Sequence, residues 1–188
     1  MTKEERAVAL TLLISFLYGL SFLVQSGVFI LPIPLFPLFS FIAGGYICLS
    51  NFKISRVCSG FFISALAIKF LLSTFFLMFV LREELYGEFM NGAWPVILKL
   101  LYYALIVLGS LKLILNNRTT RRILYALFFL LLFIISLLFN APFLLGVTFL
   151  FVFIITKIEK DELQVFGLIP LIIGIFDTLD WAFVLFAR

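Results

Sequence analysis

The chain is divided by long apolar runs that alternate with short polar segments. A helix that crosses the hydrocarbon layer of a membrane needs about 20 mainly apolar residues. Of the 188 residues, 64% are hydrophobic and 13% are charged, whereas soluble domains are about half apolar and about a quarter charged. A soluble fold of this size exposes too much surface to hide so many apolar side chains. The sequence therefore predicts an all-α, polytopic membrane bundle that forms one integral membrane domain over residues 1–188, without a soluble domain.

Seven transmembrane helices are predicted from these runs, with ends defined to within about 2–4 residues. The predicted spans are Ala7–Val24, Leu35–Ser50, Val57–Leu81, Pro95–Leu115, Ile123–Phe139, Phe143–Thr156 and Val165–Phe186. The segment Gln25–Pro37, which leads into the second span, contains Pro32, Pro34 and Pro37. These prolines predict an extended or broken entry to the span, because proline lacks the backbone N–H of a helix interior. A bundle of six spans with a re-entrant C-terminal hairpin is the alternative.

Basic residues mark alternate connections between the predicted spans. They occur at Lys3 and Arg6, Lys53 and Arg56, Arg118 to Arg122, and Lys157 and Lys160. Segment Arg82–Trp94, on the opposite side, is rich in glutamate. Because short cytoplasmic loops carry an excess of Lys and Arg, we expect the N-terminus inside, the C-terminus outside, and the cytoplasmic (inner) membrane as the location. The first run lacks a small-residue cleavage site, so we interpret it as a span and not as a signal peptide.

Charged residues inside the apolar runs are the candidate site. Lys69 and Asp177 each lie twelve residues from the inner end of their span, about 18 Å at a rise of about 1.5 Å per residue. Both are therefore near the middle of a hydrocarbon layer that is about 30 Å thick. An unpaired charge at that depth costs at least about 2.5–3.5 kcal/mol, so we predict that Lys69 contacts Asp177. Asp180, one turn farther out, is predicted to pair with Lys99.

This predicted intramembrane charge cluster has two interpretations. In the first, the ion pairs only determine how the spans assemble, because removing one member of a buried pair is strongly destabilising. In the second, a carboxylate binds a cation or relays protons. Pro170 precedes Asp177 by about two turns and Gly174 precedes it by about one turn. Together they predict a helix kink, and interrupted helices line the binding sites of many transporters.

Several chemistries are excluded by the residues that the sequence lacks. It contains no histidine, which removes Ser-His-Asp triads and histidine ligation of zinc or haem. Cys48 and Cys58 are predicted to be buried apolar side chains. The scattered basic residues do not form the patch that nucleic acids require. We therefore predict no catalytic residue, no cofactor, no metal and no nucleic-acid partner.

Three functions remain, and the first is favoured. The chain is either a non-catalytic accessory or scaffold subunit of a larger membrane complex, or a small transporter or ion or proton pathway that uses Asp177, Asp180 and Lys69. The third is an intramembrane lipid-acting enzyme, in which two carboxylates one turn apart share a proton. The predicted partners are the lipid bilayer, other membrane protein subunits, and anionic lipid headgroups near Arg118, Arg121 and Arg122.

Overall fold

The protein is an all-α bundle. The structure is a computed structural model, and it describes residues 2–25, 35–80, 92–117, 119–139 and 141–186. These residues form seven α-helices and one short 3₁₀-helix, η1, without a sheet. The elements are α1 (Lys3–Gln25), α2 (Leu35–Ser50), α3 (Arg56–Val80), α5 (Trp94–Ile114), α6 (Thr120–Leu138), α7 (Pro142–Glu159), η1 (Glu162–Gly167) and α8 (Leu168–Phe186). Pro32, Pro34 and most of the acidic segment 82–94 lie outside the described residues.

Four of the described helical segments are long and apolar enough to cross a membrane. They are Arg56–Thr74, Trp94–Ile114, Thr120–Leu138 and Glu162–Leu179. Pro37–Ser50 is apolar but shorter. By length and composition, these segments are typical of an integral membrane protein with several spans. Each of the seven predicted spans coincides with a helix to within four residues at either end, while the number of membrane crossings stays a prediction.

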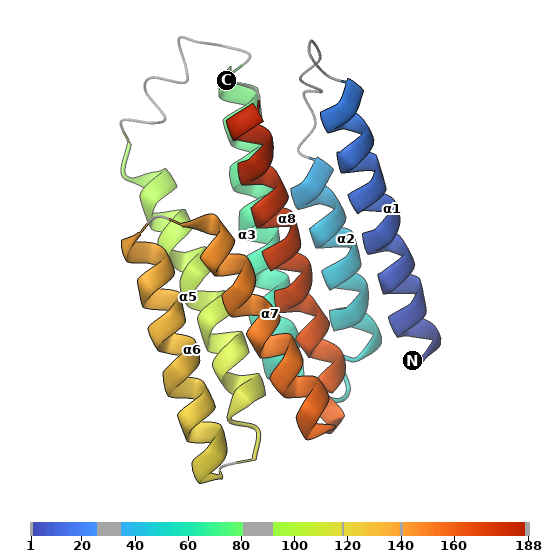
Figure 1. Cartoon of the computed structure of the whole chain (residues 1–188), viewed down its shortest axis with the longest axis vertical. Helices are drawn as coiled ribbons and strands as arrows, with labels where there is room; N and C mark the ends of the chain where they lie inside the picture. Colours follow the sequence, from blue (N-terminus) through green and yellow to red (C-terminus); the bar gives the residue numbers. More distant parts are fainter. Residues whose placement is uncertain (1, 26–34, 81–91, 118, 140, 187–188) are drawn as a thin grey trace.

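The helices run side by side and alternate in direction, so α1 begins at one end of the bundle and α8 finishes at the other (Figure 1). Helix α8 contacts α7, α2 and α1, while α3 contacts α2 and α5. Helix α6 packs on α7 at the edge of the bundle opposite α1 (Figure 1). This arrangement brings α3, α5 and α8, which are far apart in the sequence, around one part of the interior.

Small residues allow the closest helix contacts, as is usual in membrane bundles. A Cβ atom added at Gly174 of α8 would lie 3.1 Å from Cβ of Phe149 and 3.3 Å from Cα of Gly146, both on α7. A Cβ atom added at Gly44 of α2 would overlap the side chain of Leu66 on α3. The backbones of α7 and α8 therefore meet at Gly146 and Gly174, and this contact supports the position of α8.

The last helix begins later than predicted. The predicted span started at Val165, but residues Glu162–Gly167 form the 3₁₀-helix η1 and α8 begins at Leu168. Pro170 is therefore the third residue of α8 and lies in its first turn. Backbone N–H groups in the first turn have no partner within the helix, so the missing N–H of proline costs no hydrogen bond there. The change in helix type thus comes before Pro170, and a kink at Pro170 and Gly174 stays a prediction.

Candidate functional site

Lys69 of α3, Asp177 of α8 and Tyr102 of α5 meet inside the bundle. The Nζ of Lys69 forms an ion pair with Oδ1 of Asp177. The hydroxyl of Tyr102 donates a hydrogen bond of 3.2 Å to Oδ2 of the same carboxylate. Nζ of Lys69 also lies 5.8 Å from the centre of the Tyr102 ring, a cation–π distance. The predicted contact between Lys69 and Asp177 is therefore present, and Tyr102 is a third member that the sequence analysis missed.

The side chains of this Lys69–Tyr102–Asp177 cluster are largely, but not fully, buried. The exposed fractions of the Lys69 and Asp177 side chains are 14% and 11%, and Tyr102 is 5% exposed. Each carboxylate oxygen has a polar partner, one a cation and the other a hydroxyl. Opposite charges in contact offset much of the cost of taking each out of water. The cluster can therefore hold three helices together, and it has the groups needed to pass a proton between a carboxylate and a hydroxyl.

The second predicted pair is not described by the structure. Lys99 lies on an exposed face of α5. Asp180 belongs to α8, but its side chain lies outside the described part of the chain. A contact between Lys99 and Asp180 therefore stays a prediction.

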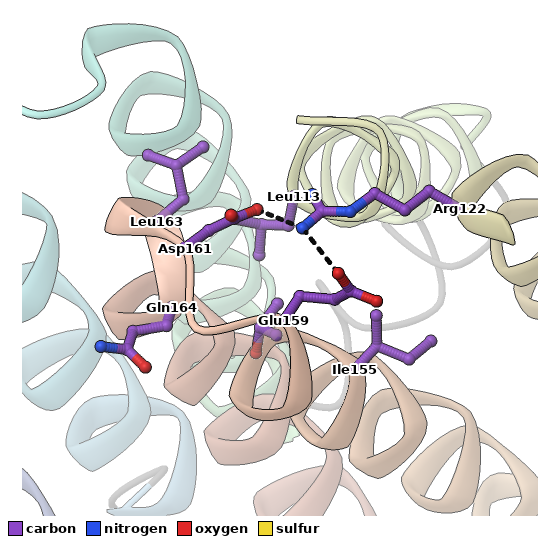
Figure 2. A pocket seen from close by; sticks show the side chains of 8 residues that line it. Leu113, Arg122, Ile155, Glu159, Asp161, Leu163 and Gln164 are labelled. Carbon is purple, nitrogen blue, oxygen red and sulfur yellow. Dashed lines mark hydrogen bonds and ion pairs between the residues drawn. The ribbon is translucent and has the colours of Figure 1, made fainter. Parts of the chain in front are cut away.

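A second charge cluster lies where α6 begins and α7 ends (Figure 2). The Arg122 side chain is only 4% exposed, and Nη2 lies 3.3 Å from Oε2 of Glu159 and also pairs with Oδ2 of Asp161. Figure 2 shows both carboxylates directed at the guanidinium group. Nδ2 of Asn117 donates a hydrogen bond of 3.2 Å to Oδ1 of Asp161. The cluster joins α6 to the connection between α7 and η1.

Two local features of the backbone position this Arg122 cluster. Thr119 is the N-cap of α6, and its hydroxyl accepts a hydrogen bond of 3.4 Å from the backbone N–H of Arg122. Lys160 ends α7 in the left-handed conformation, with φ of 45°. That turn reverses the chain, so Glu159 before it and Asp161 after it both reach Arg122.

The presence of anionic lipid headgroups near Arg118, Arg121 and Arg122 stays a prediction. The Arg122 side chain is buried and paired with two carboxylates of the same chain. Arg121 is exposed, and its Nε donates a hydrogen bond of 2.6 Å to the Tyr125 hydroxyl, so a role at the membrane surface stays a prediction for this residue. Arg118 lies outside the described residues. The sequence did contain an indication of this cluster. The acidic residues of segment 157–162 carry the charge opposite to that of the basic segment 118–122.

A third ion pair joins the beginning of α1 to the end of α7. Nζ of Lys157 donates to Oε1 of Glu5 at 2.9 Å. Thr2 and Glu5 also form a capping box, in which each side chain accepts a hydrogen bond from the other residue's backbone N–H. The hydrogen bond from Lys157 is the main reason why the pKa of Glu5 is lowered from its ordinary value of 4.5, and burial opposes it. Glu5 precedes the first predicted span, so this pair lies at one end of the bundle.

No metal centre is apparent among the described residues. None of them form a group of three or more His, Cys, Asp or Glu side chains able to hold a metal ion. Cys48 and Cys58 are free thiols and are fully buried, as predicted. The described site therefore consists of charged and hydroxyl groups that partner one another.

Comparison with protein-family models, with curated proteins and with solved structures finds no match for the chain.

Proposed function

We propose that the chain is a non-catalytic accessory or scaffold subunit of a larger membrane complex, with seven spans, the N-terminus inside and the C-terminus outside. The observation that carries the proposal is the Lys69–Tyr102–Asp177 cluster. Its polar groups satisfy one another and link three helices, as expected of groups that fix an assembly. The Arg122 cluster and the pair between Glu5 and Lys157 act in the same way at other helix contacts.

The surface supports this proposal because large apolar side chains are exposed on the outer helices. On α6, exposed apolar residues recur along one face: Ile123, Leu124, Leu127, Leu131, Ile134 and Leu138. A membrane helix that packs within one chain on a single face leaves such a stripe for lipid or for helices of another subunit. The charged groups described above pair within the chain, so this apolar face of α6 is a surface that is available for association.

Copurification tests the proposal directly. The chain is extracted from its native membrane in a mild detergent, captured through an affinity tag, and the captured proteins are quantified by mass spectrometry. We expect at least one membrane protein at fixed stoichiometry with the chain. A Leu127→Arg/Leu131→Arg double variant on α6 should lose this partner while the chain is still inserted. Recovery of the chain as a monomer that is active alone would contradict the proposal.

A proton pathway is the second candidate, and one observation favours it. The Asp177 side chain keeps 11% exposure while it contacts both an ammonium group and a hydroxyl, and intramembrane carboxylates with such partners serve as proton relays in pumps and transporters. Liposomes containing the purified chain and a pH-sensitive dye test it. Proton flux that is lost in a correctly folded Asp177→Asn variant would favour the pathway over the accessory role. An intramembrane lipid-acting enzyme is less well supported, because the partners of Asp177 among the described side chains are Lys69 and Tyr102.

A further inference from the structure

A groove of about 520 Å³ lies between α1 on one side and α7 and α8 on the other. Its apolar wall includes Ala9, Leu12 and Phe16 of α1, Phe153 of α7, and Leu171 and Ile175 of α8. Its volume falls within the range of about 300–1,000 Å³ that is typical of small-molecule sites. The groove is independent of the Lys69–Tyr102–Asp177 cluster, whose residues do not line it.

One end of the groove is charged. Glu5 and Lys157, which form the ion pair between α1 and α7, are the two charged residues in its wall. The Glu5 side chain is 7% exposed and the Lys157 side chain is 35% exposed, so the cation is the group presented to a ligand. An ammonium group has three donors, and the contact with Glu5 uses one of them. This end of the groove therefore suits an anion such as a phosphate.

The described part of the groove is about as long as one leaflet of a membrane. Along α1 the described wall extends from Glu5 to Phe16, which is about 16 Å at a rise of about 1.5 Å per residue. Half of a hydrocarbon layer of about 30 Å is about 15 Å. On α8 the wall stops at Ile175, although Thr178 and Leu179 farther along are also described. A spanning helix of another subunit needs the full thickness of the membrane, whereas an acyl chain needs one leaflet.

We propose that this groove binds one acyl chain of a glycerophospholipid from the adjacent leaflet, with the lipid phosphate at Lys157. The apolar wall accepts the chain, and Lys157 stands at the level where the headgroup of that leaflet begins. The bound lipid would fill the space between α1 and the contact of α7 with α8. It would thereby act as part of the bundle and not as a reactant.

Photocrosslinking tests the proposal on the unmodified chain. The protein is reconstituted in nanodiscs that contain a phosphatidylglycerol with a diazirine midway along one acyl chain, and crosslinked peptides are identified by mass spectrometry after illumination. We expect crosslinks to concentrate on Leu12, Leu171 and Ile175. Labelling of the exposed α6 residues Leu127 and Leu131 at the same level would overturn the proposal, because it would show only general contact with lipid.

A groove-filling variant provides the second readout. Native mass spectrometry of the chain in mild detergent should show one retained phosphatidylglycerol per chain. Ala9→Trp should lower this retention at least about tenfold, since excluding even two methylene groups from burial weakens binding by about that factor. Leu127→Trp on α6 is the matched control and should retain the lipid.

Further outcomes test the headgroup site and the acyl-chain site separately. Diacylglycerol, which lacks the phosphate, should be retained less than phosphatidylglycerol if Lys157 binds the headgroup. Equal retention of the two would overturn the role of Lys157. Retention unchanged by Ala9→Trp, or crosslinks from this groove to a second protein in the native membrane in place of lipid, would overturn the groove as a lipid site.

Discussion

Tyr102 of α5 and Asp177 of α8 are joined by a hydrogen bond of 3.2 Å between the phenol hydroxyl and the carboxylate that also pairs with Lys69. The carboxylate thus has a neutral partner on one oxygen and a charged partner on the other. Because these partners come from different helices, Asp177 links α8 to α5 and α3 at one point.

Tyr102→Phe should destabilise the bundle by about 0.6–1.7 kcal/mol. Hydrogen bonds to charged groups contribute about 1.5–3 kcal/mol in water-soluble proteins, and those between membrane helices contribute less, up to about 1.7 kcal/mol. The free energy of unfolding, measured by titration with sodium dodecyl sulphate in mixed micelles, checks this value. Tyr103→Phe is the control, because the hydroxyl of Tyr103 makes no hydrogen bond within the described part of the chain. Equal effects of the two substitutions would refute the role assigned to the Tyr102 hydroxyl.

Arg122→Met should destabilise the protein by about 3–5 kcal/mol, since it leaves Glu159 and Asp161 facing each other without the buried cation between them. Arg122→Lys should recover only part of the loss, because a lysine ammonium cannot reproduce the planar fork of the guanidinium. Thermal unfolding in detergent, followed by circular dichroism, checks both. Arg121→Met, at the exposed neighbouring position, should leave the melting temperature unchanged. A melting temperature of Arg122→Met close to that of the unsubstituted chain would mean that the cluster does not stabilise the fold.

The ion pair between Glu5 and Lys157 predicts a loss of stability in acid. The folded-state pKa of Glu5 is lowered, so the pair contributes fully above the ordinary carboxyl pKa of 4.5 and is lost as the pH falls through the lowered folded value. The difference in melting temperature between the unsubstituted chain and Glu5→Gln, measured from neutral pH downwards, should shrink below pH 4.5. A difference that stays constant across this range would contradict the prediction. Groups common to both proteins cancel in this comparison.

Gly174→Ala should destabilise the contact between α7 and α8 by about 1–3 kcal/mol, the usual cost of forcing an extra carbon into a filled site. The added carbon would meet Gly146 backbone atoms at 3.3 Å, which cannot rotate away as a flexible side chain does. Gly45→Ala on α2 is the matched control, because a Cβ atom there meets no described atom within 4 Å. We expect Gly45→Ala to be neutral or slightly stabilising, as alanine favours a helix over glycine. Measuring the free energy of unfolding of both variants tests this prediction.

Much of the fold was predictable because each helix needs its own apolar run, and the runs are separated by polar or proline-containing segments. The contact between Lys69 and Asp177 was predictable for a related reason. A charge within an apolar run needs an opposite charge at the same depth, and few candidates exist. The cost of burying an unpaired charge therefore makes a contact between two distant helices predictable from the sequence.

The remaining contacts were not predictable from the sequence, because none of them is required by the cost of burying an unpaired charge inside the membrane. The Tyr102 hydroxyl is neutral and can lie at many depths, so its position follows only from the packing of α5 on α3. Arg122 lies close to a predicted membrane surface, where an arginine can meet headgroups, water or carboxylates equally well. The groove between α1 and α8 depends on side-chain shapes at a helix contact, which the pattern of apolar residues does not record.

The most direct measurement is a double-mutant cycle on Lys69 and Asp177, read as the free energy of unfolding in mixed micelles. If the pair serves assembly, Lys69→Met and Asp177→Leu should each cost about 3–5 kcal/mol, because each leaves one buried charge alone. The double variant, which places two apolar side chains there, should return to within about 1 kcal/mol of the unsubstituted chain and keep its copurifying partner. Single variants that unfold like the unsubstituted chain, or a double variant as unstable as the sum of the two, would contradict the account.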